Sequence, residues 1–232
     1  MAAAIARARE HGIGCVALAN TNHWMRGGTY GWQAADAGVI GICWTNTLPN
    51  LPPWGTDAAR IGNNPLVVAV PRDSGAHIVL DMALSQFSYG ALAGYRSRGE
   101  PLPVPGGFDR AGALTTDPAE IEATKRPLPI GFWKGTGLSI VLDVIAASLS
   151  RGRATHEIPP SPEQETALSQ TFIAIDGSTI GDAAEMRQIA DAVVDDLHAR
   201  YPGQRTLAKR LDHLRNGIVV DESAWAFAVS LG

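Results

Sequence analysis

Near the start of the chain, a histidine, a tryptophan and an arginine stand directly before two glycines. They belong to the run NHWMRGGTYGWQ, residues 22–33. Glycine lets a backbone approach a ligand closely. The amide groups that open a helix form an anion site, here with Arg26 beside them. This arrangement suits cofactor phosphates or a small acidic substrate. The alternative is a structural turn with an exposed His23 and a core Trp24.

A lysine stands at the expected mouth of a later helix, within residues 131–137, GFWKGTG. Its charge adds to the partial positive charge of the helix end. Gly135 and Gly137 remove side chains that would block a phosphate, and Trp133 offers a flat face for a ring. Lys134 is equally well explained as an exposed residue at a helix start.

Three further polar positions have both a structural and a functional explanation. Asp81 ends an apolar strand and is expected to be partly buried. It therefore needs a partner, such as a cofactor hydroxyl, a backbone amide or an arginine. Arg205 either binds a phosphate or decorates a helix start, and the pair Asn63–Asn64 forms a turn or a ligand loop.

One apparent nucleotide motif is rejected. Residues 12–17, GIGCVA, match the G-x-G-x-x-A pattern literally. That pattern binds a dinucleotide only where a strand precedes the glycines and a helix follows them. Here the expected order is helix, glycines, strand, so any bound nucleotide is not held by a Rossmann turn.

Composition describes an ordinary globular chain and excludes several classes of protein. The 232 residues are 45% hydrophobic and 18% charged, with a formal net charge of -4. Such a balance argues against nucleic-acid binding. No apolar run has membrane-spanning length, and the first ten residues lack the apolar block of a signal peptide, so the cytoplasm is expected. Cys15 and Cys43 are expected to be buried free thiols. The six histidines lack metal-site spacing, so no metal site is predicted.

Hydrophobic periodicity and turn residues predict the elements that must position these side chains. Strands at 66–70 and 77–82 should form an antiparallel hairpin. The proline- and glycine-rich stretches 48–65 and 99–132, and the polar stretch 150–169, are expected to be loops. The remaining predicted strands are 13–19, 39–44 and 171–175, and the predicted helices are 2–10, 29–37, 138–149, 182–200, one opened by 202–205, and a short one starting near Asp221.

Taken together, these segments resemble one family, the malate/L-lactate dehydrogenase-type 2-keto-acid reductases, which are unrelated to the Rossmann dehydrogenases. The match runs in order along the whole chain. The segments that carry it are 22–32 (NHWMRGGTYGW), 41–47 (GICWTNT), 52–55 (PPWG), 61–66 (IGNNPL), 80–83 (LDMA), 86–90 (QFSYG) and 133–138 (WKGTGL).

The resemblance implies an α+β fold with a mainly antiparallel (mixed) sheet, surrounding helices and a non-Rossmann NAD(P) site. Residues 1–232 should form a single catalytic and cofactor-binding unit, with a cofactor-binding subdomain at roughly 66–175. The implied activity is hydride transfer between NADH, or NADPH, and a 2-keto acid or related sugar acid. The implied partners are this small molecule and a second copy of the chain, in a homodimer with active sites between subunits, and neither nucleic acid nor membrane.

The resemblance also implies which residues contact the dinucleotide. His23 would lie near the nicotinamide end and support catalysis. The cofactor contacts carried over from the family are His23, Ile78, Val79, Leu80, Asp81, Met82, Ala83, Trp133, Lys134, Gly203, Gln204 and Arg205.

The chain departs from the family pattern in two places. Family members carry an N-terminal helical segment with a Ser-His-Gly motif, whose histidine is the proton donor, and a nearby arginine that grips the substrate carboxylate. Both are expected upstream of Met1, so no residue of this chain is a certain catalytic residue. Gln204 stands where an ionisable residue is expected. The alternative function is an N-terminally truncated, non-catalytic remnant that still binds the cofactor or a partner subunit.

Overall fold

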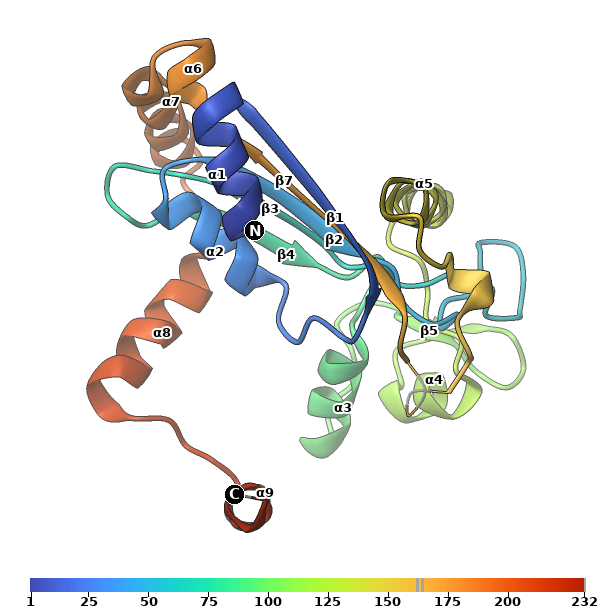
Figure 1. The fold of residues 1–232 in the computed structure, drawn as a ribbon. Helices are drawn as coiled ribbons and strands as arrows, with labels where there is room; N and C mark the ends of the chain where they lie inside the picture. Colours follow the sequence, from blue (N-terminus) through green and yellow to red (C-terminus); the bar gives the residue numbers. More distant parts are fainter. Residues whose placement is uncertain (162, 164, 232) are drawn as a thin grey trace.

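A five-stranded antiparallel sheet forms the centre of the molecule in the computed structural model, which describes residues 1–161, 163 and 165–231 (Figure 1). Every neighbouring pair in it is antiparallel. In spatial order the strands are β1 (Ile13–Thr21), β7 (Leu168–Ile175), β2 (Ile40–Thr45), β3 (Leu66–Val70) and β4 (Ile78–Met82). The predicted hairpin is the pair β3–β4, and β1 and β4 are the two edges of the sheet. The α+β class and the antiparallel sheet are thus confirmed.

Helices cover both faces of the sheet. Helices α1 (Ala2–His11) and α2 (Gly28–Asp36) lie on one face, and α5 (Trp133–Ser150) lies on the other (Figure 1). Helix α1 comes very close to β1, because a Cβ atom on Gly14 would lie 2.0 Å from the carbonyl oxygen of Ala4. The order helix, glycine, strand is therefore observed, and Gly14 serves helix packing instead of a nucleotide.

Two apolar clusters attach these helices to the sheet. Trp24, Trp32, Val67 and Phe172 belong to the cluster beneath α1 and α2. On the other face, Trp44 packs with Leu84, Leu142 and Ala146. The indole nitrogen of Trp44 also donates a hydrogen bond to the carbonyl of Leu142 (2.9 Å), which fixes α5 against β2. Burying aromatic side chains of this size contributes heavily to stability.

Buried asparagines hold the loop that follows β2. Asn64 accepts a hydrogen bond from the amide of Thr47 (3.1 Å) and donates to the carbonyl of Ser139 (2.9 Å). Asn46 donates to Asp143 (2.9 Å) and is fully buried. Because the side-chain amide groups of Asn64 are engaged by the protein itself, the structural explanation of the pair Asn63–Asn64 is favoured over a ligand loop.

A small unit within residues 85–132 was missed by sequence reasoning. The predicted loop 99–132 contains a two-stranded hairpin, β5 (Gly107–Phe108) and β6 (Leu114–Thr115), and helix α4 (Pro118–Thr124). Helix α3 (Tyr89–Ser97) precedes them, and a cluster of Leu92, Leu102 and Ile121 holds the unit together. The Asp117–Pro118 pair is a helix-start signal, with Asp117 accepting from the amide of Ala119 (2.8 Å).

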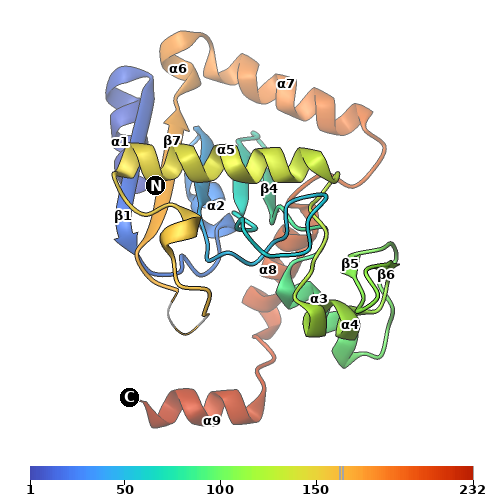
Figure 2. The same cartoon turned by 90° about the vertical axis from the view of Figure 1, so that its right-hand side faces the viewer.

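In the C-terminal third, the 3-10 turn η1 (Thr155–Glu157) precedes β7, and the short helix α6 (Gly177–Ile180) follows it. Helix α7 (Ala183–Asp196) comes next. Helix α8 (Gln204–Asn216) follows, and α9 (Glu222–Ser230) ends the described chain. Helices α8 and α9 extend away from the sheet (Figures 1 and 2). Asp221 caps α9 as predicted, accepting from the amide of Ala224 (2.9 Å), but α9 contains no buried residue.

Several boundaries and one burial prediction are wrong. The helix expected from 138 begins at Trp133, the strand expected from 171 begins at Leu168, and the helix expected over 182–200 ends at Asp196. Cys15 is exposed, because β1 is an edge strand whose alternate side chains face solvent, whereas Cys43 is buried as expected. Within the described residues, no helix is both long and apolar enough to span a membrane.

Candidate functional site

The edge strand β4 carries five of the twelve residues expected to contact a cofactor, and Ala83 follows directly after it. The amide of Val79 donates a hydrogen bond outward to the carbonyl of Pro202 (3.0 Å) instead of to a neighbouring strand. In an antiparallel pair, residues two apart along a strand point their backbone groups in the same direction. The backbone of Asp81 therefore also faces this edge, where no further strand of the sheet follows β4.

The turn that opens α8 lies against the start of β4, and glycine is required there. Gly203 has a φ of +95°. A Cβ atom on it would lie 3.0 Å from the amide nitrogen of Val79 and 3.2 Å from the carbonyl oxygen of His77. The structure thus brings Gly203, and with it Gln204 and Arg205, to the predicted strand segment.

The opposite end of β4 leads to the start of α5. The residue after Ala83, Leu84, accepts a hydrogen bond from the amide of Ile130 (2.8 Å), and Ile130 in turn accepts from the amide of Gly135 (2.8 Å). Trp133 and Lys134, in the first turn of α5, are exposed. A strand of five residues spans about 17 Å, so the two predicted cofactor contacts at 133–134 and 203–205 lie toward opposite ends of β4.

One part of the 131–137 motif has a structural cause instead of the expected one. A Cβ atom on Gly135 would come within 2.4 Å of the carbonyl oxygen of Ile130. Gly135 is therefore required by the turn beneath it, and not by room for a phosphate. At Gly137, no atom lies within 4 Å of the place that a Cβ atom would take, which agrees with the expected free space beside it.

The anion site expected at the start of α2 is not available to a ligand in the way predicted. The carboxylate of Asp81 accepts a hydrogen bond from the amide of Gly28 (2.9 Å) and so supplies the negative charge at this helix end. A Cβ atom on Gly28 would lie 2.6 Å from the same carboxylate oxygen. Asp81 is exposed, so the prediction of partial burial is wrong, while a backbone amide was among its expected partners.

The segment before α2 combines both of the interpretations given for it. Trp24 is buried in the core, and a Cβ atom on Gly27 would lie 2.5 Å from its indole ring. Both observations agree with the structural alternative, a turn that packs a core tryptophan. His23 is exposed, and its Nδ1 accepts a hydrogen bond from the amide of Met25 (3.0 Å). In the neutral ring the proton must then sit on Nε2, so His23 presents a hydrogen-bond donor to its surroundings.

A groove of about 980 Å³ runs between α2 and α8. Two arginines singled out in the sequence, Arg26 and Arg205, both line it, and Lys209 and Arg210 join them from the next turn of α8. In the part of the chain that the structure describes, none of these four cations forms an ion pair. The other lining residues are Thr29, Tyr30, Trp32, Gln33, Asp36, Thr206, His213, Leu214 and Ile218.

Lys209 and Arg210 were missed by sequence reasoning, although a signal was present. Residues four apart on a helix share a face. Once 202–205 is taken as a helix start, Arg205 and Lys209 are expected on one side of that helix. Arg210 also approaches α2, with its guanidinium carbon 5.9 Å from the ring centroid of Trp32.

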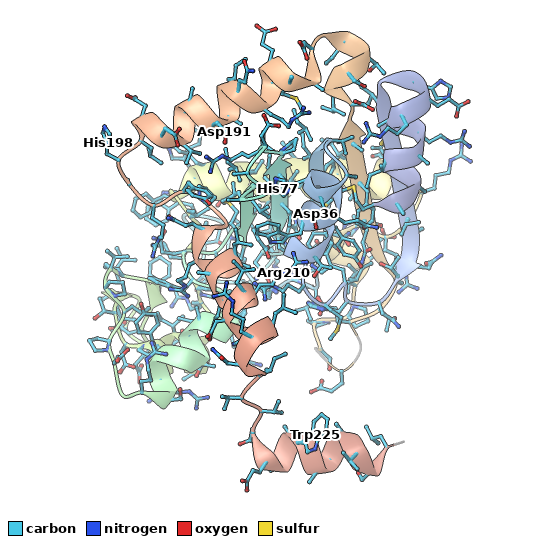
Figure 3. The ribbon with its side chains drawn as sticks, turned by 90° about the vertical axis from the view of Figure 1, so that its left-hand side faces the viewer. Asp36, His77, Asp191, His198, Arg210 and Trp225 are labelled. Atoms are coloured by element: carbon cyan, nitrogen blue, oxygen red, sulfur yellow. The ribbon has the colours of Figure 1, made fainter. Side chains whose placement is uncertain are left out.

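A buried histidine supports the upper part of this groove (Figure 3). The ring of His77 lies 5.9 Å from that of Trp32, and its Nε2 lies 3.3 Å from a carboxylate oxygen of Asp36. Its Nδ1 accepts a hydrogen bond from the amide of Arg72 (2.9 Å). Burial lowers the pKa of His77, and the carboxylate of Asp36 offsets only part of that shift. The neutral form of His77 is therefore favoured near pH 7.

Arg72 connects the same region to α7 and to the turn before α8. Its Nε donates to the carboxylate of Asp191 (2.5 Å), and its guanidinium carbon lies 5.3 Å from the ring centroid of Tyr201. Tyr201 immediately precedes Pro202 and Gly203. The framework around Arg72 thus holds the turn at the position where Pro202 bonds to β4.

Comparisons with known proteins agree with this architecture. The family model described as malate/L-lactate dehydrogenase matches residues 1–227. A protein named 2,3-diketo-L-gulonate reductase from Citrobacter koseri is 49% identical over 233 residues, covering 96% of this chain and 70% of that relative. A protein of the same name from Salmonella newport is 48% identical over the same shares.

Solved structures give the same result at lower identity. Sulfolactate dehydrogenase from Methanocaldococcus jannaschii matches 95% of this chain and 66% of its own, with a TM-score of 0.83 and 26% identity. Delta1-piperideine-2-carboxylate reductase from Pseudomonas syringae matches 98% and 70%, with a TM-score of 0.86 and 26% identity. This chain spans about two thirds of the length of these similar proteins. It belongs to the malate/L-lactate dehydrogenase family of oxidoreductases.

Proposed function

We propose that this protein takes part in the NADH- or NADPH-dependent interconversion of a 2-keto acid and a 2-hydroxy acid, with 2,3-diketo-L-gulonate or a related sugar acid as the substrate. The observation that carries the proposal is the contact between Val79 and Pro202, which joins two segments 123 residues apart. Both segments were expected to contact a dinucleotide. Membership in an oxidoreductase family and the names of the similar proteins support the same chemistry.

The residues along β4 fit an extended dinucleotide. The outward-facing backbone of Asp81 offers a donor and an acceptor for hydrogen bonds, and Lys134 and Arg205 offer positive charge near the two ends of the strand. Such groups suit the amide, hydroxyl and phosphate groups of a pyridine dinucleotide. The exposed ring of Trp133 offers a surface for a flat base.

When bound, the dinucleotide supplies the hydride of the reaction. The chain's own residues position the dinucleotide and polarise the substrate. The backbone of β4 orients the dinucleotide, and the Nε2–H of His23 can donate a hydrogen bond to a substrate oxygen. His23 is proposed as a supporting residue and not as the proton donor. The reduced ketone also needs a proton on oxygen, and the family resemblance implies a separate histidine, in a Ser-His-Gly motif, for that step.

We also propose that the protein works as a homodimer with its active sites between subunits. The outward face of α5 supports this, because Ile140, Val141, Val144 and Leu149 are each about half exposed. A contiguous apolar face of this kind is typical of an interface. Size-exclusion chromatography with light scattering should give twice the chain mass, and charged substitutions at Val141 and Val144 should give a monomer. A monomeric wild type would refute the dimer.

Binding and turnover together test the proposed function. Quenching of tryptophan fluorescence should report binding of NADH or NADPH to the protein, and Arg205→Gln should weaken it. Arg215→Gln, on the same helix but outside the groove lining, is the matched control and should leave the dissociation constant unchanged. Turnover should be measured against a panel of 2-keto acids with both cofactors.

The two outcomes separate the enzyme from the alternative function. Binding with turnover of a keto acid supports the reductase. Binding without any turnover supports the non-catalytic remnant that retains a cofactor site. If no dinucleotide binds, the proposal is wrong.

A further inference from the structure

We infer that the groove between α2 and α8 holds a phosphate monoester on the ribose of the bound cofactor, so that the protein prefers NADPH to NADH. The inference rests on the proposed function and deepens it. It concerns the four cations that line the groove, Arg26, Arg205, Lys209 and Arg210. The proposed function uses only Arg205 among them.

The charge balance of the groove favours a strongly anionic ligand. These four side chains carry four positive charges, and Asp36 is the only acidic residue in the lining that the structure describes. The two phosphates of NADH carry two negative charges. A 2′-phosphate adds about 1.5 to 2 more at pH 7 if it ionises as other phosphate monoesters do. The groove therefore matches a ligand with more negative charge than NADH supplies.

These four cations are available to a ligand. In the described ranges, no carboxylate lies within ion-pair distance of any of the four. The single acid, Asp36, is directed toward His77, with 3.3 Å between its carboxylate oxygen and Nε2. Four like charges along one groove repel one another, and an anionic ligand relieves that repulsion.

The groove begins beside β4, where the cofactor is proposed to lie. Gly203 lies against Val79, and α8 runs away from that contact. Arg205 is in the first turn of α8, and Lys209 and Arg210 follow about one turn, or 5.4 Å, farther along. A cofactor that lies along β4 and passes the Gly203 turn would enter the groove directly, with Arg205 at its entrance.

Arg210 is oriented by an aromatic ring. Its guanidinium carbon lies 5.9 Å from the centroid of Trp32, whose side chain is almost fully buried in the core. An aromatic face of this kind restrains a guanidinium group without neutralising it. Arginine presents several donors in a rigid fork, which suits phosphate oxygens. In dinucleotide sites of another fold, a nearby arginine likewise accommodates the 2′-phosphate, whereas an acidic residue binds the free 2′-hydroxyl.

Two small nucleotides isolate the contribution of the 2′-phosphate. Isothermal titration calorimetry should show that adenosine 2′,5′-bisphosphate binds at least about 10-fold more tightly than 5′-AMP, because hydrogen bonds to charged groups are worth about that factor or more. The double variant Lys209→Gln/Arg210→Gln should reduce this ratio to below about 3-fold. Because Arg26 and Arg205 remain, 5′-AMP should lose less affinity than the bisphosphate does.

The control is the double variant Arg200→Gln/Arg215→Gln, which removes the same charge from two exposed positions on either side of the groove residues. It should retain the full preference. Circular dichroism of both variants should match the wild type. Inorganic phosphate, tested as a competitor, should displace the bisphosphate only at far higher concentration.

The results separate this inference from the proposed function. If NADH and NADPH bind with equal affinity, or if the groove variant keeps the preference, the inference is overturned while the reductase proposal stands. Equal competition by inorganic phosphate would also overturn it, because the groove would then be a general anion surface. If neither dinucleotide binds at all, the proposed function fails first.

Discussion

Replacing Gly203 by alanine should disturb both stability and cofactor binding. A left-handed backbone costs a residue with a Cβ atom about 1–2 kcal/mol. In addition, the new Cβ atom would lie 3.0 Å from the amide nitrogen of Val79, which is closer than most Cβ contacts. Relieving that contact moves the turn away from β4 and weakens the bond between Val79 and Pro202, a loss of about 1 kcal/mol.

The expected total for Gly203→Ala is about 2–3 kcal/mol of unfolding free energy, with each kcal/mol lowering the melting temperature of a chain of this size by about 2–4 °C. Gly99→Ala is the control. Gly99 also has a positive φ, of +67°, but no atom lies within 4 Å of its Cβ position. That variant should lose only the backbone contribution and should bind dinucleotide normally.

The assay is thermal unfolding followed by circular dichroism, together with the dissociation constant for NADPH from fluorescence quenching. Gly203→Ala should melt below Gly99→Ala and should bind about five-fold more weakly, which corresponds to about 1 kcal/mol. Equal melting temperatures and an unchanged dissociation constant for the two variants would refute the argument that the Gly203 turn is held against β4 at a cofactor site.

Three other predictions follow from single contacts. Asp81→Ala should lower the unfolding free energy by about 1 kcal/mol, because the amide of Gly28 loses its acceptor, and Asp81→Asn should lose less. Burial lowers the pKa of His77, so as the pH falls the unfolded state gains a proton before the folded state does. The free energy of unfolding should therefore be full above pH 6.5 and decrease below it. In urea titrations at several pH values, His77→Asn should reduce this dependence. Burial raises the pKa of Cys43 to about 12, so a thiol reagent should label only Cys15 in the native protein.

Each of these has a contradicting result. An Asp81→Ala protein as stable as the wild type would mean that solvent replaces the lost cap. A pH dependence that is unchanged in His77→Asn would assign it to another group. Labelling of two thiols before unfolding, or labelling that persists in Cys15→Ser, would show that Cys43 is accessible.

The strands could be predicted well, because short apolar runs bounded by turn residues identify them. The pair 66–70 and 78–82 is the best example, since proline, serine and glycine mark the turn between them. The same pattern misjudged Cys15. An apolar run was taken as buried on both faces, but β1 is an edge strand and four of its nine residues are exposed. Strand order cannot be obtained from the run itself.

The candidate site was predictable in its parts but not in its connections. The resemblance supplied 78–83, 133–134 and 203–205 as separate segments, and only the fold shows that two of them meet at Val79 and Pro202. The anion site at α2 was misjudged because its acceptor, Asp81, is 53 residues away along the chain. Local helix-start rules contain no information about such a partner.

The short elements between 85 and 132 were missed for another reason. They are rich in proline and glycine, and their helices are too short to show a clear apolar repeat. Their stability comes from tertiary packing around Leu92 and Ile121, which are fully buried. Helix formation of this kind depends on contacts outside the segment.

A crystal structure of the protein with reduced dinucleotide tests the central claim most directly. The cofactor should lie along the outer edge of β4, touching the backbone of Asp81, with the Gly203 turn at one end and Lys134 toward the other. Density for a dinucleotide on any other surface, with the β4 edge uncontacted, would contradict it.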